Sequence, residues 1–111
     1  MKTFNIKDMT KGWFVGNITP VAFSTKDCEV AFKQYKKGDK DVLHFHKVAT
    51  EITLVASGKI SINGDIYEQG EIIVIAPYEV SKFEAIEDST TVVVKLPGAN
   101  NDKFEVIIPQ G

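Results

Sequence analysis

Arginine is absent from this sequence, and its absence restricts the partners that we expect. All 13 basic residues among the 111 are lysines. The planar guanidinium fork, which binds phosphates and carboxylates through two parallel hydrogen bonds, is therefore missing, and this disfavours a phosphate-clamping enzyme. The net charge of −2 gives no electrostatic attraction to nucleic acid or to an anionic membrane. We expect neither nucleic acid nor membrane as a partner.

Cysteine and long apolar segments are also scarce. Cys28 is the only cysteine, so no internal disulfide can form, and a disulfide-stapled secreted scaffold is excluded. The first ten residues lack the apolar core of a secretory signal. The longest uncharged stretch, 12–25, is too short and too polar to span a bilayer. We therefore expect a cytoplasmic protein in which residues 1–111 form a single domain.

Leucine is rare as well, with three residues against 12 valines and 12 isoleucines. Branching at Cβ suits a pleated strand better than a helix, so this balance predicts an all-β chain. Turn signals such as Asn63-Gly64 separate short apolar runs about every 8–12 residues, which is typical of a sandwich, a jelly roll or a small barrel. The predicted strands are Trp13–Val15, Cys28–Tyr35, Val42–His46, Glu51–Ala56, Lys59–Ile62, Glu71–Ile75, Ser81–Ile86, Thr91–Leu96 and Phe104–Ile108. We expect the first ten residues and 99–103 to be the most mobile parts.

Several predicted strands are apolar on both faces, among them 72–75 and 92–94. One face can fill the interior, and the other must be covered as well. The cover is either the chain's own termini or a second copy of the chain, and we favour a homodimer.

The sequence has two histidines, His44 and His46, and they are two residues apart. Alternation along a strand places both imidazoles on one face. Glu51 opens the next predicted strand, and the short turn between them allows its carboxylate to return beside the rings. Two neutral nitrogen donors and one anionic oxygen suit a divalent metal ion, with coordination positions left open. The alternative is that the histidines are hydrogen-bonded interior residues without a ligand.

These residues carry a resemblance to a known family. Gly38, His44, His46, Glu51 and Gly58 match the spacing of the first cupin signature, and the segment 70–77 resembles the start of the second. The resemblance covers about 28–96 and implies a double-stranded β-helix, the jelly roll of the RmlC-like cupins, with the site inside the barrel. The resemblance also implies that His44, His46 and Glu51 are the metal ligands.

The second signature departs from the family at the position of its third histidine, which falls on Ser81. A set of two histidines and one carboxylate remains, which is the arrangement associated with non-haem iron and usable by other metals. We therefore expect a divalent ion (Fe, Mn, Zn or Ni) together with a small polar ligand, as in a metal-dependent oxygenase or isomerase. The alternative is a non-enzymatic module that binds a carbohydrate or another small molecule without metal, because a fold does not determine function. Besides the three ligands, the predicted pocket is lined by Val42, Thr53, Ser81 and Phe83.

Overall fold

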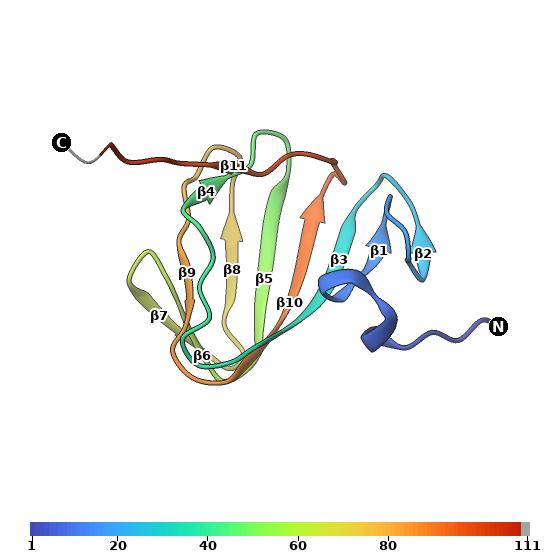
Figure 1. Cartoon of the computed structure of the whole chain (residues 1–111), viewed down its shortest axis with the longest axis horizontal. Helices are drawn as coiled ribbons and strands as arrows, with labels where there is room; N and C mark the ends of the chain where they lie inside the picture. Colours follow the sequence, from blue (N-terminus) through green and yellow to red (C-terminus); the bar gives the residue numbers. More distant parts are fainter. Residues whose placement is uncertain (110–111) are drawn as a thin grey trace.

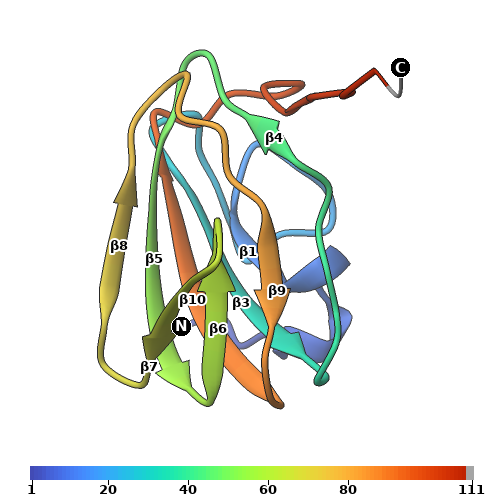
Figure 2. The ribbon, with the colours of Figure 1, turned by 90° about the vertical axis from the view of Figure 1, so that its left-hand side faces the viewer.

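The computed structural model describes residues 1–109. Two β-sheets face each other, as Figures 1 and 2 show. The larger sheet has the order β2-β1-β3-β10-β5-β8 and the smaller one the order β7-β6-β9. The strands of the larger sheet are β1 (Trp13–Gly16), β2 (Phe23–Ser24), β3 (Glu29–Tyr35), β5 (Thr50–Ser57), β8 (Ile72–Ile75) and β10 (Ser89–Leu96). Those of the smaller sheet are β6 (Lys59–Ile62), β7 (Asp65–Glu68) and β9 (Phe83–Ala85).

A third, two-stranded pairing closes one end of the barrel. It joins β4 (His44–Phe45) to β11 (Phe104–Glu105), which lie together at the top of Figure 1. The helical structure in the described residues is limited to two 3-10 turns, η1 (Ile6–Asp8) and η2 (Thr10–Gly12). No helix in residues 1–109 is long and apolar enough to cross a membrane. The all-β jelly roll expected from the sequence is confirmed.

The predicted strands are largely present, but two are shorter than predicted and two were missed. The strand predicted over Val42–His46 is reduced to β4, and the one over Phe104–Ile108 to β11. The sequence pattern missed β2 and β7, which have little apolar alternation of their own. The predicted turn at Asn63-Gly64 is confirmed, because both residues have positive φ (54° and 84°) between the antiparallel strands β6 and β7.

The apolar core lies between the two sheets, and Ile75 extends it to the level of Glu51, its register partner on β5. Val55, Ile60, Ile62 and Ile75 are buried there from both sheets. Tyr67, Ile73 and Phe83 pack against this cluster. Full burial of each aliphatic side chain contributes roughly 1.5–3 kcal/mol, so this cluster stabilises the contact between the two sheets.

The outer face of the larger sheet is apolar too. Cross-strand pairing aligns two rows on this face: Phe32, Val92, Leu54 and Ile72 in one, and Val30, Val94, Ile52 and Val74 in the other. Ile72 and Val74 are more than half exposed. The β8 edge of this face is thus uncovered in the single chain, and the homodimer remains a prediction that this surface supports.

Candidate functional site: a polar cavity at the histidine end of the barrel

Strand β4 and the residues around it place the two histidines inside the barrel. His44 and His46 are 6% and 3% exposed, and their ring centroids lie 5.3 Å apart. His44 is paired in antiparallel fashion with Ser81, through backbone N–H···O bonds of 3.0 and 2.8 Å in the two directions. The expected same-face arrangement of the histidines is therefore present, and Ser81 lies directly beside His44.

The hydrogen bonds of the two rings differ. The Nδ1–H of His44 donates to the carbonyl of Val42 at 2.7 Å, which leaves the lone pair of its Nε2 free. The Nε2 atom of His46 is buried, and among residues 1–109 it has no hydrogen-bond partner. Burial, together with the charge of Lys95, lowers the pKa of His46 to about 4. His46 is therefore neutral at physiological pH and can donate a nitrogen lone pair to a ligand.

Two neighbouring cavities lie beside the two imidazole rings and share several lining residues. An inner cavity of about 60 Å³ is lined by Tyr35, Asp41, His44, Glu51, Thr53, Ile62, Ile75, Ser81, Phe83, Thr91 and Val93. An outer cavity of about 240 Å³ is lined by Lys11, Trp13, Lys33, Tyr35, Asp41, His44, His46, Glu51, Val93, Lys95 and Lys103. His44 and Glu51 border both cavities, so the outer one leads towards the inner one.

Most of the residues predicted for the pocket lie around these cavities. Glu51, Thr53, Ser81 and Phe83 line the inner cavity. The prediction for Val42 is wrong, because its side chain is 44% exposed and lines neither cavity. The prediction assumed that strand alternation extends back to Val42. Val42 precedes β4, which begins at His44, so its side chain does not share the face of the histidines.

Asp102 fixes the loop that joins the histidines to Glu51. It is 8% exposed, and its two carboxylate oxygens accept from the backbone N–H groups of Lys47, Val48 and Ala49 at 2.9–3.1 Å. Burial acts to raise the pKa of Asp102, but these donors outweigh it and hold the pKa below its usual value. This anchor lies in the segment 99–103, which the sequence led us to expect as mobile.

The sequence analysis also missed charged and aromatic residues of the cavity. Tyr35 lines both hollows, and burial raises its pKa to about 12, which keeps the hydroxyl protonated. Asp41 accepts from the Lys103 ammonium at 2.9 Å through each of its oxygens and lies 3.9 Å from Nδ1 of His44. A sequence signal existed for Lys33 and Tyr35, which alternate with buried Ala31 along β3.

The donor types fit a divalent metal ion, because the buried, unpartnered nitrogen of His46 lies beside His44 in a cavity that Glu51 also lines. Their positions fit it less completely. Within residues 1–109, no three side chains of His, Cys, Asp or Glu are placed to hold one ion together. The two imidazoles thus lie together, and within the described residues Glu51 does not complete a set of three donors with them.

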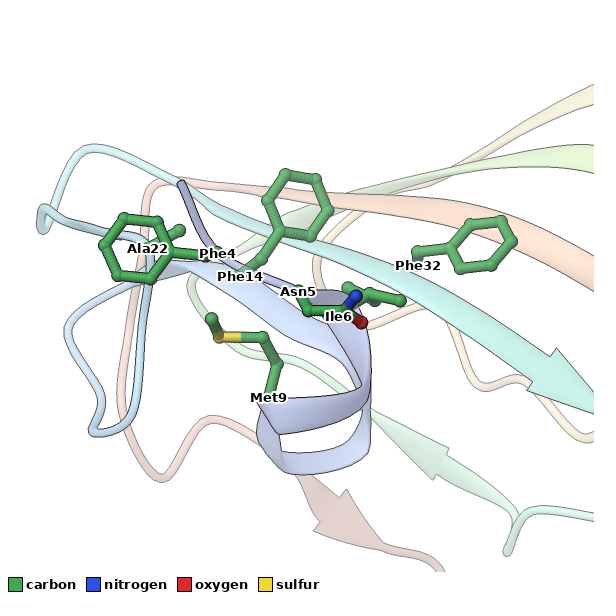
Figure 3. Close-up of a pocket in the computed structure, with 7 residues that line it drawn as sticks. All are labelled: Phe4, Asn5, Ile6, Met9, Phe14, Ala22 and Phe32. Carbon is green, nitrogen blue, oxygen red and sulfur yellow. The ribbon is translucent and has the colours of Figure 1, made fainter. Parts of the chain in front are cut away.

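A larger hollow lies elsewhere and has a different character. It measures about 450 Å³ and is lined, as Figure 3 shows, by Phe4, Asn5, Ile6, Met9, Phe14, Ala22 and Phe32. None of these side chains titrates, and none belongs to the histidine cavity. The hollow forms where the N-terminal segment lies against β1 and β3.

Comparison with solved structures identifies the architecture. An uncharacterised protein with a double-stranded β-helix domain from Klebsiella pneumoniae superposes with a TM-score of 0.66 at 24% identity, over 73% of this chain and 71% of that one. An RmlC-like cupin from Shewanella frigidimarina gives a TM-score of 0.63 at 16% identity, over 70% and 72%. The chain has the cupin fold. No protein-family model matches the sequence, and no curated protein does.

One further neighbour is a metal-containing protein. Oxalate decarboxylase from Bacillus subtilis, which is described with Mn(II) centres, superposes on this cupin barrel with a TM-score of 0.64 at 18% identity. The match covers 74% of this chain and 25% of that one. At such low identity these similarities show the fold alone.

Proposed function

We propose that this cupin barrel binds a divalent metal ion through His44 and His46, with Glu51 as the third ligand, and a small polar ligand in the outer cavity. The observation that carries the proposal is the buried Nε2 of His46, which has no partner among the described residues. A buried polar group without a hydrogen bond costs about 1–3 kcal/mol, and a ligand on that nitrogen offsets the cost. The Mn(II) centres of a neighbour with the same fold support the same assignment.

The side chains have separate roles in this site. The Val42 carbonyl holds the His44 ring by its Nδ1–H and directs Nε2 to the ion. The Glu51 carboxylate supplies the negative charge that two neutral imidazoles lack. Fe, Mn, Zn and Ni all accept such a mixed set. The bound ion would supply Lewis-acid or oxygen chemistry at its open positions.

Metal content after reconstitution tests the proposal. Purified protein is stripped with chelator, incubated separately with Mn²⁺, Fe²⁺, Ni²⁺ and Zn²⁺, and desalted before elemental analysis. We expect close to one equivalent of at least one metal, and roughly a tenfold or greater loss of affinity in His46→Ala and Glu51→Gln. Glu87→Gln is the matched control, since Glu87 is exposed and outside both cavities. Less than about a tenth of an equivalent of every metal would refute the proposal.

Ser81→His sharpens the test. Ser81 pairs with His44, so an imidazole at position 81 would join the other two rings and complete a three-histidine set. We expect about a tenfold or greater gain in metal affinity. An unchanged affinity would show that position 81 does not contribute to the metal site.

A second function, a module that binds a small molecule without metal, is favoured by one observation. The described residues do not gather three metal donors, whereas four lysines line the outer cavity. Treatment with chelator distinguishes the two functions, because a module that needs no metal binds its ligand equally well before and after chelation.

A further inference from the structure

Lysine side chains are concentrated at the outer cavity. Lys33 on β3 and Lys95 on β10 occupy inward-facing positions of the larger sheet and are only partly exposed. Lys11 from η2 and Lys103 before β11 complete the set. The cavity thus has four ammonium groups against the carboxylates of Asp41 and Glu51.

Most of this positive charge is not neutralised within the chain. Lys103 is engaged by Asp41 at 2.9 Å. In the part of the chain that the structure describes, Lys11, Lys33 and Lys95 have no carboxylate oxygen within 4.0 Å of Nζ, although Glu51 lies opposite Lys95 in the strand register. Three ammonium groups therefore lack an anionic partner at the mouth of a cavity that leads to the histidines.

We propose that the outer cavity binds a small organic anion through a carboxylate held between Lys33 and Lys95, beside the Trp13 ring. This inference rests on the proposed function, because it takes the barrel cavity as the ligand site, but it does not require the metal.

The position of Trp13 supports an organic anion. Nζ of Lys33 lies 4.8 Å from the centroid of the indole ring, and Nζ of Lys95 lies 5.0 Å from it. Both ammonium groups therefore lie over one indole ring, so an anion that binds them has its carbon skeleton close to an aromatic side chain. Inorganic phosphate has no apolar part to use that surface. We therefore favour a carboxylate over a phosphate.

Size and charge agree with this assignment. A volume of about 240 Å³ is below the roughly 300–1,000 Å³ of pockets for drug-sized ligands, which favours a small molecule. Burial, and after it the charge of Lys95, lowers the pKa of Lys33 to about 8. A bound carboxylate would relieve the repulsion between the two ammonium groups.

Malonate binding to metal-free protein tests the inference. Trp13 is the only tryptophan, so its fluorescence reports on the site, and calorimetry gives the affinity. Malonamide, a neutral analogue, and inorganic phosphate serve as comparison ligands. The variants are Lys33→Met and Lys95→Met, with Lys33→Arg to retain the charge. Lys82→Met is the matched control, because Lys82 is exposed and lines neither cavity. Circular dichroism of each variant checks that it is folded.

We expect malonate to change the Trp13 fluorescence and to bind about tenfold or more tightly than malonamide or phosphate. Lys33→Met and Lys95→Met should each weaken malonate binding by about tenfold. Lys33→Arg should retain more of the malonate affinity than Lys33→Met, because the charge is kept. Lys82→Met should stay close to the unmodified protein. The inference is overturned if malonate binds no better than malonamide, if phosphate binds more tightly, or if the two methionine variants bind normally. Because no metal is present, this result is independent of the metal-content experiment.

Discussion

The two ends of the barrel are built from the same strands but differ in what they bury. On β5, Val55 is fully buried in the apolar cluster with Ile60, whereas Glu51, four residues earlier, borders the cavity of the histidines. The apolar end gains stability from close packing. The histidine end buries polar groups, one of which, Nε2 of His46, lacks a partner among the described residues. The difference agrees with our proposal that one end stabilises the fold and the other binds a ligand.

Shortening a side chain in the apolar cluster should have the largest effect on the free energy of unfolding. Ile60→Ala leaves a cavity where the two sheets meet, and we expect a loss of about 2–5 kcal/mol in the free energy of unfolding, measured with denaturant. Ile66→Ala on β7 is the control, since Ile66 is 49% exposed, and it should change that free energy by less than about 0.5 kcal/mol. Equal losses in the two variants would mean that the cluster at Ile60 is not the main core.

Removing the anchor of the histidine end should give the next largest effect. Asp102→Ala leaves the amides of Lys47, Val48 and Ala49 without their acceptor, and we expect a loss of about 1–3 kcal/mol. Asp27→Ala, which removes an exposed carboxylate, is the control. Because the loop carries the chain from His46 to Glu51, Asp102→Ala should also weaken metal binding. Unchanged stability would show that the loop holds its shape without Asp102.

Acid should destabilise the histidine end of the metal-free protein. The pKa of His46 is about 4 in the folded chain, below its ordinary value of 6.5. The unfolded chain therefore binds this proton first, and stability should fall as the pH drops from about 6.5 to 4.

His46→Leu should flatten the stability profile in that interval, because the titrating group is gone. The Asp102 carboxylate, whose pKa is lowered, adds its own loss only below its ordinary range and does not blur the comparison. Urea titrations at several pH values measure how the free energy of unfolding changes with pH. The same pH dependence in His46→Leu would contradict the assignment of this loss to His46.

Charge on the outer face should have the smallest effect on the fold of the single chain. Ile72→Lys and Val74→Lys replace exposed residues, so each should alter chain stability by less than about 0.5 kcal/mol. If the chain is the homodimer we predict, the double variant should sediment as a monomer at concentrations where the unmodified protein sediments as a dimer. A monomeric unmodified protein would contradict the predicted homodimer.

The sequence predicted the architecture well because period-2 alternation and turn residues act locally. The β-branched runs and the Asn63-Gly64 turn identify most strands without any knowledge of distant contacts. The spacing of His44, His46 and Glu51 in the sequence likewise sufficed to predict that they line one cavity.

The rest of the site depends on contacts between residues far apart in the chain. Asp102 binds backbone groups more than 50 positions away, and Lys33 and Lys95 meet at Trp13 only after β1, β3 and β10 have paired. Apart from the alternation of Lys33 with Ala31 along β3, nothing local in the sequence distinguishes these residues from solvated charges. At Val42 the sequence analysis made a different error, because it extended strand alternation to a residue that precedes β4.

Nitrogen chemical shifts of the two imidazole rings test the central claim most directly, because the chain contains only two histidines. In ¹⁵N-labelled, chelator-treated protein, Zn²⁺ is added to slight excess. The account predicts that Nε2 of both His44 and His46 shifts to the position of a metal-bound nitrogen, while Nδ1 of His44 remains protonated by its bond to Val42. Ring nitrogens whose chemical shifts do not change, even when Zn²⁺ is then raised to about a tenfold excess, would contradict the account.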